Sequence, residues 1–194
     1  SGRVLVDGID VRDYDLYALR DKIGFIPQKA LLFSGSISEN IRYGKEHALD
    51  NEVQDSAYLA SADAFIQAKP HKYDEWLSEG GSNVSGGQKQ RLSIARALVR
   101  RPEIYIFDDS FSALDYKTDA LIRKNLKKIT KDSITFVVAQ RISSIVDSDT
   151  IVVMNEGEIV GMGTHLELMK TCPIYIEIAQ SQLSEKEMAQ YENI

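Results

Sequence analysis

The chain has 194 residues, 43% of them hydrophobic and 27% charged, which is the composition of a globular domain with a substantial core. Its formal net charge of −6 argues against a nucleic-acid-binding surface, so we expect no nucleic-acid partner. The single cysteine excludes an internal disulfide, and the first residues do not resemble a signal peptide, nor does any apolar run approach the length of a membrane span.

The first predicted elements lead to a polar side chain just beyond a strand. In order, they are a strand at 3–6, a return strand at 9–11, a helix at 13–22 and a strand at 23–26. Pro27 stops the last strand, and Gln28 follows at once. A polar amide in this position is either a plain turn residue or a ligand contact, and the residue alone favours neither interpretation.

The next predicted elements are helices, with no strand signal before Gly80-Gly81. They are expected from 36 or 38 to 43, over 50–60 and over 63–68. Ser85 is a good N-cap residue for a further helix over 88–100, and Gly86 and Gly87 leave its start without side chains. Bare N–H groups at a helix N-terminus form an anion site, most often for phosphate. For a lone Ser-Gly-Gly-Gln string, a glycine turn before an amphipathic helix is the simpler interpretation.

A short apolar strand at 104–107 delivers two carboxylates, Asp108 and Asp109, at its carboxyl end. Ligands bind at that end of the strands in α/β sheets. Further on, the predicted elements are a helix at 116–129, a buried strand at 133–139, a helix at 142–146, strands at 150–154 and 159–160, helices at 164–170 and after Pro173, and a polar tail from Ser184. This alternation of strands and helices predicts a parallel sheet with crossover helices.

These stretches together resemble the ATP-binding-cassette (ABC) family. In that resemblance the signature motif is Val84–Gln88, the Walker B strand is Ile104–Asp108 and the D-loop is Ser112–Asp115. The string Ile26–Gly44 is similar to the exporter branch of the family, in which Gln28 would be the Q-loop glutamine. The resemblance covers residues 1 to about 171.

The resemblance implies an α/β fold, with a P-loop NTPase (RecA-like), mostly parallel sheet core and an inserted helical subdomain. The expected parts are the start of the core over 1–28, the helical subdomain with the signature over 29–100, the rest of the core over 101–172, and a C-terminal helix and tail over 173–194. A P-loop string, G-x-x-x-x-G-K-[ST], is absent, because Gly44-Lys45 has Glu39 in place of the first glycine and Glu46 after it. We therefore expect the chain to be the C-terminal part of a nucleotide-binding domain, with the P-loop upstream.

The resemblance also implies roles for individual residues. ABC domains pair head to tail, so the signature residues would contact the phosphates of the ATP that the partner domain holds; these are Ser85, Gly86, Gly87 and Gln88. The other expected roles are Mg²⁺ binding by Asp108 and Gln28, contact with the attacking water by Gln28, coupling across the dimer by Asp115, and contact with transmembrane domains by Glu79. The family commonly has Arg where this chain has Gly80, so Glu79 is the only charged residue carried over to that contact.

Two positions depart from the pattern of hydrolytic ABC domains. The family has Glu where this chain has Asp109, and a carboxylate that retreats by roughly 1 Å can cost about a hundredfold in rate. The family has His where this chain has Gln140, which donates a hydrogen bond but cannot exchange a proton as imidazole does. Either change alone is compatible with neutral drift, whereas both together indicate a degenerate hydrolytic site.

The sequence therefore predicts the ATP-binding subunit of an export pump at the cytoplasmic face of the cell membrane, with ATP and Mg²⁺ as cofactors. Its partners would be transmembrane domains and a second nucleotide-binding domain, as a heterodimer in which the signature serves the partner's competent site. A homodimer with two slow sites stays open. So do a soluble ABC ATPase that is not tied to transport and a regulatory module that does not hydrolyse ATP.

Overall fold

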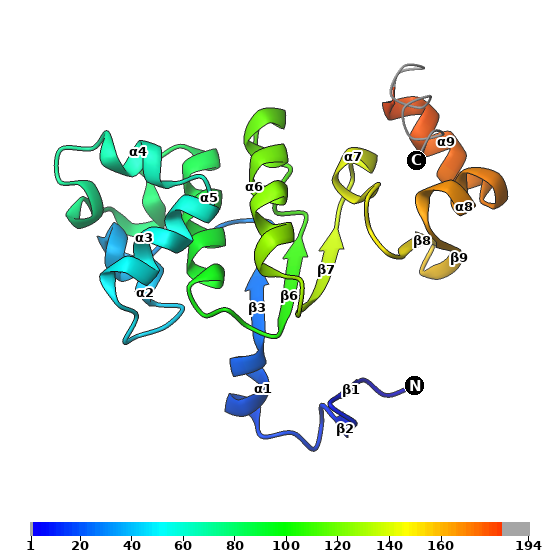
Figure 1. The fold of residues 1–194 in the computed structure, drawn as a ribbon, viewed down its shortest axis with the longest axis horizontal. Helices are drawn as coiled ribbons and strands as arrows, with labels where there is room; N and C mark the ends of the chain where they lie inside the picture. The colour runs from blue at the N-terminus through cyan, green and yellow to red at the C-terminus, as the bar shows by residue number, and fades with distance from the viewer. Residues whose placement is uncertain (1, 184–194) are drawn as a thin grey trace. The chain divides into compact units, whose positions relative to one another are not determined.

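The computed structural model describes residues 2–183 (Figure 1), which belong to two compact units that meet in the sequence between Val138 and Ala139. The elements of the first unit are, in order, β1 (Leu5–Val6), β2 (Ile9–Asp10), α1 (Leu16–Lys22), β3 (Ile23–Ile26), β4 (Gly35–Ser36), α2 (Ile37–Arg42), α3 (Asp50–Leu59), α4 (Asp63–Gln67), η1 (Lys72–Asp74), β5 (Trp76–Leu77), η2 (Glu79–Gly81), α5 (Gly86–Leu98), β6 (Ile104–Asp108), α6 (Tyr116–Ile129) and β7 (Ile134–Val138). Among residues 2–183, no helix is both long and apolar enough to cross a membrane.

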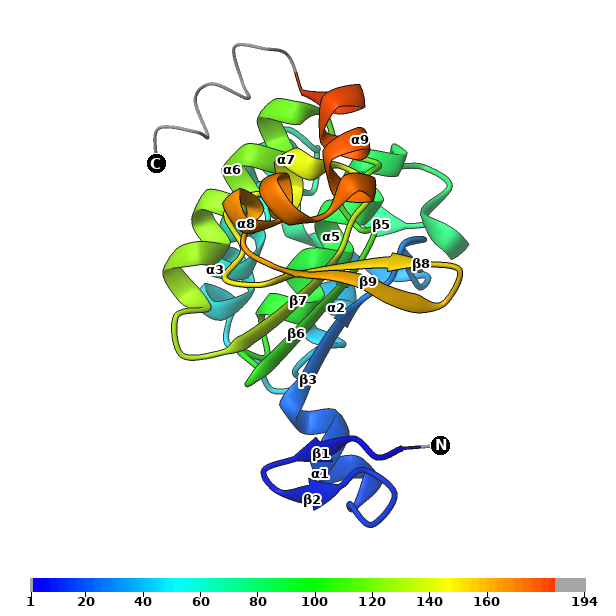
Figure 2. The same cartoon turned by 90° about the vertical axis from the view of Figure 1, so that its right-hand side faces the viewer.

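The first unit is organised around a parallel sheet with the strand order β3-β6-β7, whose strands lie side by side in Figure 2. The register aligns Phe25, Ile106 and Phe136, so one row of side chains crosses all three strands. The central strand is the most buried, and its Tyr105 and Phe107 are almost fully covered. The parallel sheet that the alternation of strands and helices predicts is therefore confirmed.

The helices α2 and α3 pack against α5, and α4 packs against α3, as Figure 1 shows on the left. Helix α5 has an apolar face because Leu92, Ala95 and Leu98 recur at helical spacing, and all three are buried. The expectation of a region without strands is wrong in one detail, because β4 and β5 pair as an antiparallel ladder of two residues each. Such short strands leave no alternation in the sequence by which they can be recognised.

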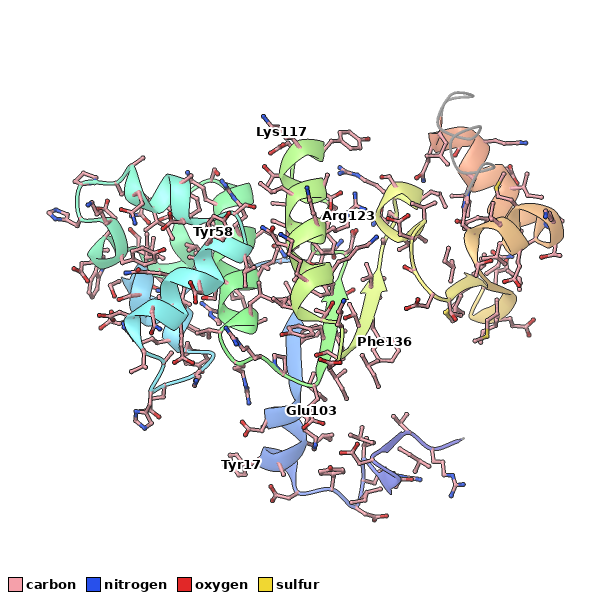
Figure 3. The ribbon with its side chains drawn as sticks, in the orientation of Figure 1. Tyr17, Tyr58, Glu103, Lys117, Arg123 and Phe136 are labelled. Atoms are coloured by element: carbon pink, nitrogen blue, oxygen red, sulfur yellow. The ribbon has the colours of Figure 1, made fainter. Side chains whose placement is uncertain are left out.

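Strand β7 was predicted to be buried, and the structure corrects this. Ile134, Phe136 and Val138 are each more than half exposed, and so is Phe25 in the same row of the sheet. Figure 3 shows the Phe136 side chain on β7. Successive side chains of a strand point to opposite faces, and the covered face is the one that holds Tyr105 and Phe107. Apolar composition predicted the strand correctly, but burial depends on which element covers each face.

The second unit has an antiparallel hairpin followed by two helices. Its elements are α7 (Ile142–Ile145), β8 (Ile151–Asn155), β9 (Glu158–Gly163), α8 (His165–Thr171) and α9 (Pro173–Gln182). They enclose a separate apolar cluster that includes Leu168, Cys172 and Tyr175. The predicted polar tail from Ser184 lies outside the described residues.

A buried histidine is expected to make the stability of this second unit depend on pH. His165 is 6% exposed, and its Nδ1 lies 2.8 Å from the hydroxyl oxygen of Tyr175. Burial lowers the pKa of His165 below its ordinary 6.5 and raises the pKa of Tyr175 to about 12. The unfolded chain therefore takes up a proton at higher pH than the folded chain, so stability should fall as pH drops below 6.5 towards the lowered pKa.

Thermal unfolding between pH 7.5 and pH 5 tests this prediction, and His165→Gln should flatten the slope of Tm against pH over that range. The pKa of the neighbouring Glu167 is also lowered, by the Thr164 backbone N–H. That carboxylate supports the fold above its ordinary 4.5 and loses this contribution only at lower pH, outside the range tested. An equal slope in both proteins would show that His165 does not titrate with unfolding.

Candidate functional site

The Ser85–Gln88 segment starts α5 with a reciprocal cap. The Ser85 Oγ accepts the Gln88 backbone N–H at 3.2 Å, and the Ser85 backbone N–H donates to the Gln88 side-chain oxygen at 3.1 Å. The capping serine uses its oxygen as the acceptor, so its hydroxyl hydrogen can still be donated to an anion. Ser85 and Gly86 are exposed, and a Cβ added at Gly86 would meet nothing within 4 Å. The start of α5 is therefore open, as a phosphate site requires.

Gly87 lies against the loop that follows β6. A Cβ added there would be 3.5 Å from the Ala113 carbonyl oxygen and 4.0 Å from the Leu114 Cδ2. Asp115, at the end of the same loop, caps α6 by accepting the Thr118 backbone N–H at 3.0 Å and the Thr118 hydroxyl at 2.7 Å. These hydrogen bonds lower the pKa of the Asp115 carboxyl. The structure thus brings the predicted signature and the predicted D-loop together within one chain.

The two carboxylates at the end of β6 differ in their surroundings. Asp108 is partly exposed, whereas Asp109 is 9% exposed and has a φ of 44°, a left-handed conformation uncommon for a residue other than glycine. The Asp109 backbone N–H donates to the Val138 carbonyl at 2.9 Å, and its carbonyl accepts the Ser112 hydroxyl at 2.7 Å. The turn after β6 is therefore fixed from two sides.

Gln28 and Asp109 meet although 81 residues separate them. The Gln28 side-chain N–H donates to the Asp109 Oδ2 at 3.0 Å. Their strands β3 and β6 are parallel neighbours, so residues just beyond their carboxyl ends lie at the same edge of the sheet. The sequence predicted both residues as site residues, and the structure joins them directly.

Two other predicted site residues, Glu79 and Gln140, are exposed. Glu79 is exposed at the start of η2, where the next residue donates its backbone N–H to the Leu32 carbonyl at 3.1 Å. Gln140 is exposed in the second unit, and its carbonyl accepts the Gln182 side-chain N–H at 2.8 Å.

Three polar side chains of α5 that were not predicted as site residues contact neighbouring loops. Gln90 donates to the Pro27 carbonyl at 3.0 Å, and Arg96 donates to the Leu31 carbonyl at 2.7 Å. Arg91 donates to the Ser61 carbonyl at 2.8 Å. Helical spacing predicted the buried face of α5, but it does not tell a buried polar residue from one at the border of that face.

The oxygen atoms at the end of β6 suit a magnesium ion. Mg²⁺ prefers oxygen ligands and keeps several waters, so one or two protein groups are enough. Asp108 offers a partly exposed carboxylate, and the Gln28 amide oxygen remains available because its nitrogen makes the bond to Asp109. Within residues 2–183 no group of three or more His, Cys, Asp and Glu side chains is placed so that it could hold a metal ion.

Comparison with known proteins identifies the family. The ABC transporter family profile matches residues 1–112. An uncharacterized ABC transporter ATP-binding protein of Mycobacterium bovis is 46% identical over 185 residues, which is 94% of this chain and 31% of that protein. YgaD of Bacillus subtilis, whose name assigns it provisionally to multidrug export as an ATP-binding/permease protein, is 46% identical over 87% of this chain and 29% of its own length.

A solved structure shows the same fold. It is described as a bacterial Atm1-family ABC exporter with ATP bound, and it matches with a TM-score of 0.91 and 38% identity over 95% of this chain and 32% of that chain. The chain thus spans about a third of the length of the relatives that it matches. The α/β fold with a parallel sheet core and helical parts, predicted from the sequence, is confirmed. The chain belongs to the ABC transporter family and has the fold of its ATP-binding domain.

Proposed function

We propose that this chain is part of the ATP-binding subunit of an ABC export pump, at the cytoplasmic face of the cell membrane. ATP binding and hydrolysis at the interface of two ATP-binding domains would drive the attached transmembrane domains. The observation that supports this best is that the chain has both an open helix start capped by Ser85 and a hydrogen bond between Gln28 and Asp109. The exporter names of the similar proteins and the TM-score of 0.91 support the transport role.

In this proposal the start of α5 contacts the phosphates of ATP bound to the partner domain. Ser85 would donate its hydroxyl hydrogen, and the backbone N–H groups of Gly86 and Gly87 would point at the phosphate. Gln88 closes the cap and keeps these groups in place. Asp115 would couple the two domains through the D-loop, and Glu79 would contact the transmembrane domains.

Asp108 and Gln28 would hold Mg²⁺ on this chain's own side of the nucleotide. Bound Mg²⁺ neutralises charge on the phosphates and orients them. Asp108 supplies a fixed negative oxygen at the end of β6, and Gln28 supplies a neutral amide oxygen that is oriented by its bond to Asp109. These 194 residues contain no G-x-x-x-x-G-K-[ST] string of the kind that wraps nucleotide phosphates.

We further propose that the hydrolytic site on this side is impaired. Asp109 has a shorter side chain than the expected Glu, and the Gln28 amide nitrogen holds its Oδ2 at 3.0 Å. The shorter side chain would leave the carboxylate farther from a water that attacks the γ-phosphate. Gln140 in place of His removes a second group at the same step. Binding of ATP is then retained while its hydrolysis slows.

The proposed assembly is a heterodimer in which the partner supplies the competent hydrolytic site. The proposed division of the chain is a core over 1–28 and 101–172, a helical subdomain over 29–100 and a C-terminal helix and tail over 173–194. A homodimer with two slow sites is the alternative within the same family.

Expression of the full-length transporter protein with and without its partner subunit tests the assembly. We expect steady-state ATP hydrolysis to be at least about tenfold higher for the mixed assembly than for the protein alone, because only the partner would supply a complete site. Equal turnover by the protein alone would favour the homodimer. Full activity in the soluble fraction of the cell, rather than in its membranes, would favour an ABC ATPase that is not tied to transport.

A further inference from the structure

Two side chains of α5 form hydrogen bonds to the segment that contains Gln28, one before Gln28 and one after it. The Gln90 side-chain N–H donates to the Pro27 carbonyl at 3.0 Å, one residue before Gln28. The Arg96 Nη1 donates to the Leu31 carbonyl at 2.7 Å, three residues after it. The helix that starts at the signature is thus hydrogen-bonded directly to the loop that contains Gln28.

Both contacts are made by buried or largely buried polar groups. Gln90 is 1% exposed, and a buried amide is costly unless it forms a hydrogen bond. Burial lowers the pKa of Arg96, whose guanidinium also lies 5.0 Å from the Phe33 ring centroid and 5.6 Å from that of Tyr43. An apolar side chain could fill the position of Gln90 without the cost of burying an amide. The amide is therefore explained by its hydrogen bond to the Pro27 carbonyl.

Gln28 is the link between this loop and the carboxylates. Its backbone follows the Pro27 carbonyl that Gln90 holds, and its side chain donates to the Asp109 Oδ2 at 3.0 Å. The path from the signature to Asp109 therefore runs through two side-chain hydrogen bonds, from Gln90 to Pro27 and from Gln28 to Asp109. Gln90 lies two residues beyond Gln88, within the first turns of α5, so both belong to one continuous helix.

We propose that Gln90 is a positioning residue that sets Gln28 against Asp109 through the Pro27 carbonyl. Because α5 also begins at the signature, this bond couples the nucleotide on this chain's own side with the nucleotide that the partner domain presents to Ser85. A shift of α5 on contact with the partner's nucleotide moves the Pro27 carbonyl and with it Gln28. This inference rests on the proposed function.

A double-mutant cycle in the full-length assembled transporter tests the proposal. Gln90→Met keeps the side-chain volume but removes the N–H donor, and Gln28→Ala removes the group it is proposed to position. Turnover is proposed to come from the partner's site, so this assay measures the coupling: losing the bond to Pro27 in Gln90→Met is expected to lower kcat for ATP hydrolysis about three- to tenfold, with KM changed less than about twofold. In the Gln28→Ala background, Gln90→Met should have almost no further effect, because the two residues act in series.

The matched control is Gln54→Met, the same change at an exposed glutamine of α3. It should leave kcat at the parent value and shows that the assembly is active. Gln90→Glu provides a second variant that keeps the shape of the side chain but loses the amide donor, and each variant is assayed below its measured unfolding temperature. Gln90→Glu should lower kcat as Gln90→Met does.

The outcomes separate this inference from the proposed function. If the effects of Gln28→Ala and Gln90→Met multiply, or if Gln90→Met matches Gln54→Met, Gln90 does not act through Gln28 and the inference is wrong while the proposed function stands. A purely structural role for Gln90 would lower the unfolding temperature and leave kcat unchanged, which also overturns the inference. If the parent and Gln54→Met assemblies hydrolyse no ATP, the proposed function itself is wrong.

Discussion

Gly87→Asp in the assembled transporter is expected to lower ATP hydrolysis about a hundredfold or more, whereas Asp109→Asn is expected to change it less than about twofold. A Cβ at Gly87 fits, because its nearest neighbour, the Ala113 carbonyl oxygen, would be 3.5 Å away. The fold should therefore survive, while the added carboxylate stands where the partner's phosphates are proposed to bind. The negative charges of the carboxylate and the phosphates would repel each other strongly when water is excluded.

Asp109→Asn is expected to be mild for two reasons. The side-chain oxygen of Asn can still accept the Gln28 N–H, so the pairing at the end of β6 is kept. In addition, the carboxylate it removes is proposed to be out of place for activating water. Steady-state ATPase assays of both variants beside the parent provide the measurement.

The matched control for the first variant is Gly157→Asp, which adds the same charge in the exposed turn between β8 and β9. It should leave turnover unchanged. If Asp109→Asn itself removed most of the activity, Asp109 would be serving as the catalytic carboxylate in place of Glu, and the degenerate site would have to be abandoned. If Gly87→Asp were as active as Gly157→Asp, the signature would not contact nucleotide.

Gly44→Ala is expected to lower the free energy of unfolding by about 3 kcal/mol or more. Gly44 follows α2 and lies directly against α5, where a Cβ would be 1.9 Å from the Arg96 carbonyl oxygen and 3.0 Å from its carbonyl carbon. Both are backbone atoms of a buried helix, so they cannot move aside as the end of a flexible side chain can. The two helices would have to separate, which would also disturb the contacts of the Arg96 side chain with Asn40.

Thermal unfolding measures this effect, with Gly86→Ala as the control. A Cβ at Gly86 meets nothing within 4 Å, and Ala is a better helix former than Gly, so Tm should stay constant or rise slightly. A Tm for Gly44→Ala within about one degree of the parent would mean that α2 and α5 can separate without cost.

The sequence by itself determined the elements and the chemistry of their ends. The apolar run at 104–107 predicted β6, and the spacing of Leu92, Ala95 and Leu98 predicted α5, because both patterns are local. Ser85 with Gly86 and Gly87 predicted an open helix start for the same reason, since a cap involves residues only three positions apart. Gln28 and Asp109 were recognisable because each follows a strand.

Only the tertiary structure decided how these parts meet. The hydrogen bond between Gln28 and Asp109 joins residues 81 positions apart and depends on the parallel pairing of β3 with β6. The hydrogen bond from Gln90 to the Pro27 carbonyl joins residues 63 positions apart. The exposure of Phe136 likewise depends on which face of the sheet other elements cover. Such contacts leave no local pattern, because a side chain's partner is set by the packing of distant elements and not by its neighbours in the chain.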